Sequence, residues 1–329
     1  MRYYKIIITP PANATPGVSF TPVTYTSVGA LGDNYSALQV DLDIYQAASH
    51  TPAPLGSITL YGVSFDSIDQ SIYLPGALIQ VFVGMTAGLP FANPDQIGLI
   101  VEGTILQAFG NFQGNNVSLS LIITGGAVDP VESINLPLIW RKGDTLTKAV
   151  TEALQTGYIG SKVTGSFNQD LVAVQDETAI YTNLKTLAVW VNSASKAINS
   201  SAKYSGASIV NTSSGFHLYD SLSPQVDNTL INYVDLIGNI TWLNVATISA
   251  KVVMRADLEV GKYVSFPALA PVVNTAIFNQ YRNKLAFNGV FLVTRLRHQG
   301  SSRQASADSW VTIIEATVVD EPQTLLLEE

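Results

Sequence analysis

Few residues of this sequence have the types and spacing that catalysis or metal binding requires. Asp41 and Asp43 form a D-x-D pair, and residues i and i+2 of a strand share a face, so the two carboxylates could converge on a divalent cation. No third ligand is evident, and we interpret the pair as solvated acids on an outward strand face. Asp66 and Asp69 could act as paired carboxylates in hydrolysis, but a turn between strands explains them more simply.

His298 is the histidine whose setting most invites a catalytic interpretation. Arg295 and Arg297 precede it at alternate positions, and these positive charges would lower its pKa. We interpret it instead as a structural or interface histidine at the junction of a strand and a loop. The sequence has no cysteine and only three histidines, which excludes disulfides, thiolate chemistry, Cys-type zinc sites and iron–sulfur clusters.

The motifs that mark common active sites are absent from the sequence. There is no G-x-S-x-G elbow, no H-E-x-x-H pair and no P-loop. We therefore predict no catalytic residues, no metal site, no cofactor and no hydrolase, transferase or lyase activity.

The composition favours a protein that buries surface against partners. Of 329 residues, 47% are hydrophobic and 13% are charged, and an average soluble domain has roughly 25% charged residues. Scarce charge with plentiful apolar residues favours an obligate oligomer or a component of an assembly. The N-terminus does not resemble a secretion signal, and no apolar run of about 18 residues exists. We expect a product made in the cytoplasm without membrane insertion.

Charge is distributed unevenly along the chain. No Lys or Arg lies between Lys5 and Arg141, a stretch that contains nine acids. From residue 260 to residue 307 there are six basic residues and no acid. We predict that these bases, together with His298, form an inter-subunit or partner interface, with chance clustering in a charge-poor chain as the alternative. The predicted interface residues are Lys262, Arg282, Lys284, Arg295, Arg297, His298 and Arg303.

Alternation of apolar and polar residues predicts strands at both ends of the chain. Leu38, Val40, Leu42 and Ile44 alternate with polar residues, which indicates a half-buried antiparallel strand over residues 37–46. Further strands are predicted over 57–64, 77–83, 97–108 and 117–124, with a hairpin turn at 113–116, and over 239–254, 263–266, 289–298 and 310–319. Regular short strands separated by turns are typical of a barrel or a sandwich.

Helical periodicity is confined to the middle of the chain. A helix is predicted from Leu146 to Gly157 after an N-cap at residues 143–145, and a second one from about Asn183 to Ile198. A strand is expected between them at residues 171–174. We predict three domains: a first β-barrel of the tube type over residues 1–126, an α+β middle domain over 127–206, and a second β-barrel with a C-terminal tail over 207–329.

A weak internal repeat relates the two predicted barrels. Residues 56–60 resemble residues 238–242, and each stretch is followed by a glycine that opens an apolar strand, Gly76 in one case and Gly261 in the other. A second glycine, Gly103 or Gly289, then begins another strand, and each half ends in an apolar strand, at 119–123 or 310–314. The predicted fold class is mainly β, with two similar antiparallel β-barrels flanking a small mixed domain.

The C-terminal residues carry a family resemblance. A strand that opens with Gly289 and Phe291 and ends in His298 and Gly300, followed by a loop with Arg303 and a Trp-x-Thr strand at 310–312, resembles the last strands of phage baseplate hub proteins. Residues 258–264 resemble the preceding strand entry of that family, and residues 58–63, 74–77 and 102–105 resemble its first barrel. The likeness extends to the hub domain of type VI secretion spike proteins.

The resemblance implies a structural hub of a contractile phage tail or a related particle. In that family two similar barrels flank a middle domain and three subunits form a ring, so that six barrels match a six-fold tail tube above and three-fold symmetry matches a spike below. The implied partners are two further copies in a homotrimer, the tail tube protein, a trimeric spike protein, other baseplate proteins and passing DNA without specific binding. The implied location is the virion tail, after assembly in the host cytoplasm, with the spike and any hydrolase as separate polypeptides.

Two consequences and one alternative follow. In a ring of alternating first and last barrels, each junction joins an acidic barrel to a basic one, and an acidic channel would not retain DNA. The nine acids concerned are Asp33, Asp41, Asp43, Asp66, Asp69, Asp95, Glu102, Asp129 and Glu132. The alternative is a two-domain β-rich carbohydrate-binding protein or a tail-associated glycan depolymerase, which would need convergent carboxylates or an exposed aromatic row.

Overall fold

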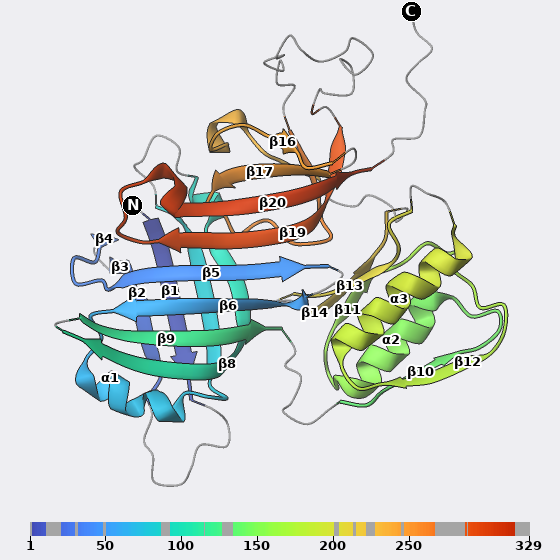
Figure 1. Cartoon of the computed structure of the whole chain (residues 1–329), viewed down its shortest axis with the longest axis horizontal. Helices are drawn as coiled ribbons and strands as arrows, with labels where there is room; N and C mark the ends of the chain where they lie inside the picture. The colour runs from blue at the N-terminus through green and yellow to red at the C-terminus, as the bar shows by residue number, and fades with distance from the viewer. Residues whose placement is uncertain are drawn as a thin grey trace, which may run out of the picture.

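A computed structural model describes residues 2–10, 21–29, 32–48, 51–86, 93–114, 116–126, 134–200, 204–212, 215–221, 228–244, 247–266, 287 and 289–319. The chain is mainly β, as predicted, and its two longer helices lie in the middle of the sequence (Figure 1). No helix in the described part is long and apolar enough to cross a membrane.

The N-terminal strands enclose one hydrophobic core. Strands β5, β6, β9 and β8 run side by side, while β7, β1 and β2 cross behind them (Figure 1). Tyr4, Ile6 and Ile58 are among the residues buried between these layers. The elements are β1 (Arg2–Thr9), β2 (Val23–Thr26), β3 (Val28–Gly29), β4 (Gly32–Asp33), β5 (Gln39–Ala47), β6 (Thr51–Tyr61), α1 (Phe65–Asp69), β7 (Leu78–Met85), β8 (Gly98–Gln113) and β9 (Asn116–Gly125), with 3-10 turns at Gln70–Tyr73 and Pro94–Gln96.

The middle segment has a core of its own, built on two capped helices. The Asn183 side chain accepts a hydrogen bond from the backbone N–H of Thr186 (2.9 Å), and the Thr145 hydroxyl caps the other helix, so both helices begin where the sequence predicts. This core extends from Leu136 to Leu218. The elements are β10 (Leu136–Trp140), α2 (Leu146–Gly157), β11 (Val163–Gly165), β12 (Glu177–Tyr181), α3 (Leu184–Ile198), β13 (Ser208–Thr212) and β14 (Gly215–Tyr219).

One strand expected in the middle segment does not form. Residues 171–174 make a single isolated bridge, between Val172 and Thr145, although Leu171 and Ala173 are buried in the core. The alternation of apolar residues in this segment therefore predicted correctly that Leu171 and Ala173 are buried. The segment is an irregular connection because it has no neighbouring strand with which to form a ladder.

The C-terminal strands enclose a third core and continue the first sheet. Their elements are β15 (Asn228–Leu230), a 3-10 turn at Tyr233–Asp235, β16 (Thr241–Trp242), β17 (Thr247–Val253), β18 (Tyr263–Ser265), β19 (Val290–Ser301), a 3-10 turn at Ala307–Ser309 and β20 (Trp310–Val318). Strand β19 pairs with β5, which joins both ends of the chain in one 13-stranded sheet. We expected two barrels, and in the described residues the hydrogen-bonded sheet closes neither. Alternation shows which face of a strand is buried, but it does not show which strand lies beside it.

The two ends of this sheet have the same strand order. In the first half, which we define as β1 to β9, the order is β5-β6-β9-β8-β7. In the last half, defined as β15 to β20, it is β16-β17-β20-β19-β18. Each half also carries a β-bulge at the same place, since the register shifts between Ile105 and Gln107 on β8 and between Val293 and Arg295 on β19. The structure thus repeats one five-stranded unit.

Matching backbone hydrogen bonds fix the repeat residue by residue. Gly76 donates to the carbonyl of Ile105 (2.8 Å), and Gly261 donates to the carbonyl of Val293 (2.8 Å). Both glycines have a left-handed backbone, with φ of 84° and 91°. Residues that carry a Cβ adopt this conformation only at a cost in free energy. The predicted match of Gly76 with Gly261 agrees with these bonds. The predicted match of residues 56–60 with 238–242 is wrong by one strand. Residues 56–60 lie on β6, whereas residues 238–242 include β16, which is the counterpart of β5.

Candidate assembly site

The junction between the two halves is a continuous antiparallel ladder. Strand β19 pairs with β18 up to its bulge, and from there it pairs with β5, from Arg295 opposite Ala47 to Ser301 opposite Asp41. A backbone bond from Ala48 to the Thr294 carbonyl (3.1 Å) lies at the point of exchange. The bulge therefore allows one long strand to serve two neighbours, as bulges bend a strand and increase its twist.

Charged residues of the two halves meet across this junction. Arg297 donates two hydrogen bonds to Asp43 (2.7 and 2.6 Å), and these bonds raise the pKa of Arg297. Arg295 pairs with Glu315 of β20 at 3.1 Å. An acidic residue of the first half and a basic residue of the last half thus meet within one chain.

The remaining residues of the predicted interface lie in different surroundings. Lys262 pairs with Glu259 at 3.1 Å, and Arg303 donates to the carbonyl of Ala37. Arg282 and Lys284 lie outside the described residues. His298 is buried inside the chain, so its ring is not on a surface that a partner could contact.

Burial, rather than the neighbouring arginines, determines the protonation of His298. Its Nδ1 lies 3.0 Å from the hydroxyl of Thr312, and desolvation lowers its pKa from 6.5 to about 4. Arg297 points to the opposite face of the sheet, toward Asp43. The buried ring is therefore neutral at physiological pH, which suits a structural role.

This burial predicts a specific sensitivity to acid. Below pH 6.5 the unfolded chain protonates His298 while the folded chain does not, so stability falls as pH drops from about 6.5 toward 4. When the pH is lowered from 7 to 4.5, the free energy of unfolding should fall for the parent by about 2–3 kcal/mol more than for His298→Gln. This difference follows from the shift of the His298 pKa at about 1.4 kcal/mol per pKa unit. Urea unfolding at both pH values measures this difference. Equal acid sensitivity of the two proteins would show that His298 does not resist protonation.

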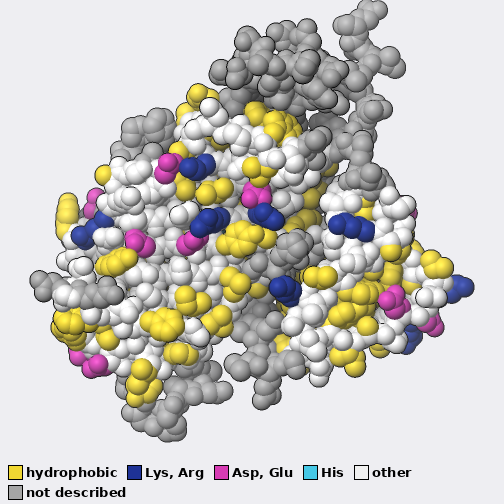
Figure 2. Space-filling model, in the orientation of Figure 1, with side chains coloured by type: hydrophobic (Ala, Val, Ile, Leu, Met, Phe, Trp, Pro, Cys, Tyr) yellow, Lys and Arg dark blue, Asp and Glu magenta, His cyan; other side chains and the backbone are white. Residues whose placement is uncertain are grey.

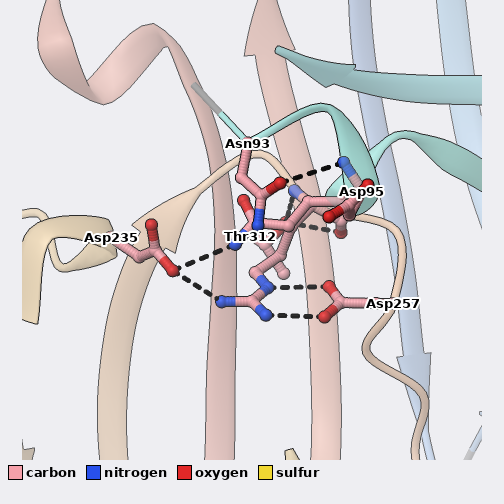
Figure 3. A network of polar contacts seen from close by, with 7 residues as sticks. Asn93, Asp95, Asp235, Asp257 and Thr312 are labelled. Atoms are coloured by element: carbon pink, nitrogen blue, oxygen red, sulfur yellow. Dashed lines mark hydrogen bonds and ion pairs between the residues drawn. The ribbon is translucent and has the colours of Figure 1, made fainter. Parts of the chain in front are cut away.

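A buried polar network provides a second connection between the halves. Arg255 follows β17, and its guanidinium contacts Asp235 (3.0 Å) on one side and Asp257 (2.7 and 2.6 Å) on the other (Figure 3). The Gln96 side chain, from the first half, donates to the same Asp235 carboxylate (3.0 Å). The backbone N–H of Ala256 donates to the Gln96 carbonyl (2.9 Å), so the network fixes a first-half turn against the last half.

Both acidic pairs considered in the sequence have structural settings. Asp41 and Asp43 share the open face of β5, as predicted, but Asp43 is bonded to Arg297. Asp66 and Asp69 lie on the short helix α1 rather than in a turn. No group of three metal-ligating side chains is present among the described residues.

The open face of the shared sheet is mostly uncharged. Figure 2 views this face, on which a few basic and acidic side chains lie among hydrophobic side chains and the white surface of the backbone and uncharged polar residues. The strands here alternate buried residues with half-exposed hydroxyl residues such as Ser57, Thr59, Ser120 and Ser249. Its two arginines on β19 are each paired with a carboxylate.

Strands β8 and β16 each have an edge without a partner strand among the described residues. Strand β8 pairs with β7 only as far as Thr104, so one edge of its last residues has no strand beside it. Strand β16 is the terminal strand at one end of the sheet, and β2 is the terminal strand at the other. Apolar side chains are exposed at both edges: Phe109 is 48% exposed and Leu243 is 54% exposed. Unpaired edges with apolar residues are sites where another chain can add. Sequence reasoning missed both edges and the Arg255 network.

Solved structures share this fold. The E. coli protein c3393, described as a type VI secretion component similar to T4 tail proteins gp27 and gp5, aligns with a TM-score of 0.53 and 11% identity over 88% of this chain and 76% of that one. The tail protein from Neisseria meningitidis MC58 aligns with 0.51 and 11% over 95% and 96%. The 43 kDa tail protein of prophage MuSo2 from Shewanella oneidensis aligns with 0.52 and 9% over 96% and 97%.

Sequence comparison adds nothing to the structural likeness. No family model and no curated protein matches the chain. The solved structures confirm the predicted resemblance to tail and baseplate proteins as a likeness of fold.

Proposed function

We propose that this protein is a structural hub of a phage-type tail, in which three copies form a ring that joins a six-fold tube to a three-fold spike. The observation that carries this proposal is the repeated unit, with strand order β5-β6-β9-β8-β7 in one half and β16-β17-β20-β19-β18 in the other. A chain with two similar units gives six units in a trimer. The three middle segments then leave the ring with three-fold symmetry. The likeness of fold to tail proteins supports the same role.

The open face of the shared sheet suits the inner wall of such a ring. Of the nine acids that we expected to line the channel, Asp41 and Asp43 lie on β5 of this face, and Asp43 neutralises Arg297. The other described acids lie on β4, on α1, in the 3-10 turn at Pro94–Gln96 and on β8, and Asp129 and Glu132 lie outside the described residues, so we do not propose a channel lined by all nine acids. Arg295 is neutralised by Glu315 in the same way. A wall of hydroxyl groups and paired charges offers DNA little net positive charge, so it would not hold a passing polyanion.

Oligomeric state tests the proposal. Native mass spectrometry of the purified chain should give a species of three times the 35.2 kDa chain mass. We expect the purified trimer to cap tail tubes in electron micrographs. A monomer that binds polysaccharide would instead support the carbohydrate-binding alternative.

A further inference from the structure

We propose that the free edge of β8 in one chain pairs antiparallel with β16 and the following residue, Leu243, of a second copy, with Phe109 opposite Leu243, so that the sheet continues from chain to chain. This inference rests on the proposed ring and specifies the junction that closes it. The second copy is the chosen occupant because the chain already contains one example of the same junction.

The internal repeat identifies that example. Strand β19 pairs with β5 after its bulge, and β8 is the counterpart of β19 with its own bulge at the matching place. Strand β16 is the counterpart of β5. Within a chain, β19 of the last half therefore pairs with β5, the first strand of the five-stranded unit of the first half. Among the described residues the first half has no equivalent partner, and β16, which has a free edge there, is the strand that a second copy can supply.

The same ladders determine the register. Arg297 lies opposite Tyr45 in the internal junction, and the repeat places Phe109 in the position of Arg297 and Leu243 in the position of Tyr45. This equivalence is obtained by following the paired residues from strand to strand in each half. The pairs in the first half are Ile44–Gly56, Ile58–Leu121 and Ile123–Ile105, and the corresponding pairs in the last half are Trp242–Ile248, Ala250–Ile314 and Ala316–Val293.

The chemistry of the two edges fits this register. Phe109 and Leu243 are both apolar and about half exposed, and they would cover each other as a cross-strand pair. Two residues along β8, Asn111 would lie opposite Thr241, which matches polar with polar. Trp242 between them turns toward the core, where its ring stacks on Phe287 at 5.6 Å, as the counterpart of the buried Ile44.

The two edges belong to different strands of the chain, so the contact is head-to-tail. Such a contact repeats until it closes on itself or continues as a filament. Closure after three steps would give a ring in which internal β19–β5 junctions alternate with β8–β16 junctions between chains.

Disulfide trapping tests the register, since the chain contains no cysteine. In the variant Phe109→Cys/Leu243→Cys the two cysteines should be directly opposite, with Cα atoms about 4.5–5.5 Å apart. Mild oxidation should give covalent dimers and trimers on a non-reducing gel. The matched positive control is Tyr45→Cys/Arg297→Cys, which should close a disulfide within one chain. The shifted control Asn111→Cys/Leu243→Cys moves one cysteine about 7 Å along the strand, beyond the reach of a disulfide.

The outcomes separate this inference from the proposed function. At least tenfold more cross-linked chain for the matched pair than for the shifted pair supports the junction. A trimer by native mass spectrometry that cross-links equally in both variants, or in neither, overturns the junction and leaves the hub role standing. A chain that stays monomeric overturns both. Cross-linked species longer than three chains support the strand pairing and contradict a three-fold ring.

Discussion

Arg255→Met should lower the free energy of unfolding by about 3–5 kcal/mol, the cost of removing one partner of a buried ion pair. The side chains of Arg255 and Asp235 are only 3% and 4% exposed, so the substitution leaves the buried Asp235 carboxylate without its cationic partner. The Gln96 side chain alone would remain to solvate it. Because Gln96 belongs to the first half, the contact between halves should loosen as well. The measurement is the midpoint of urea unfolding at fixed protein concentration.

Two further variants make this prediction specific. Asp235→Leu/Arg255→Met removes both charges and should recover most of the loss, since apolar replacement of a whole buried pair is often neutral. Asp308→Asn breaks the exposed pair of Asp308 with Lys251 and should cost about 0–1 kcal/mol. If Arg255→Met behaved like the surface variant, the network would have no role in holding the halves together.

Phe109→Lys should weaken association of the proposed trimer about tenfold. Each β8–β16 junction uses one β8 edge, so a single substitution removes the apolar contact with Leu243 at all three junctions. A cross-strand pair of this kind contributes about 0.2–1 kcal/mol at each junction. Sedimentation equilibrium of the parent and the variant measures the change.

A charge-compensating variant controls for misfolding. Phe109→Lys/Leu243→Glu should regain part of the association, because each junction then pairs a lysine with a glutamate. Ile159→Lys changes an exposed residue of the middle segment that is 92% accessible, and it should leave the trimer intact. A trimer of Phe109→Lys as tight as that of the parent would mean that the copies associate through another surface.

Local structure was predictable because burial and periodicity are written in short stretches of sequence. The alternation around Leu42 predicted β5, the cap at residues 143–145 placed the start of the first helix, and helical periodicity placed the second from about Asn183. The glycine match of Gly76 with Gly261 held because both residues need the same left-handed backbone and make the same hydrogen bond.

Strand neighbours were not predictable in the same way. Arg297 and Asp43 are separated by 254 positions in the chain, and their charges suggested only that two surfaces should meet. Nothing local indicates that both surfaces belong to one chain. The Arg255 network was missed for the same reason, since Gln96, Asp235 and Arg255 come together only after the sheet has formed. Alternation also led to the expectation of two separate barrels, where the strands of both halves share one sheet.

The ladder between β19 and β5 also has a mechanical consequence. Its residue pairs from Arg295 to Ser301 stand side by side along the strands, so a force directed along the strands loads all their hydrogen bonds together. A force across the strands would instead break the bonds one after another from an end. If the chain is the hub proposed above, a tail that drives its tip into a cell envelope would load this ladder. A joint that fails only when every bond shears at once would resist that load in the direction of the strands.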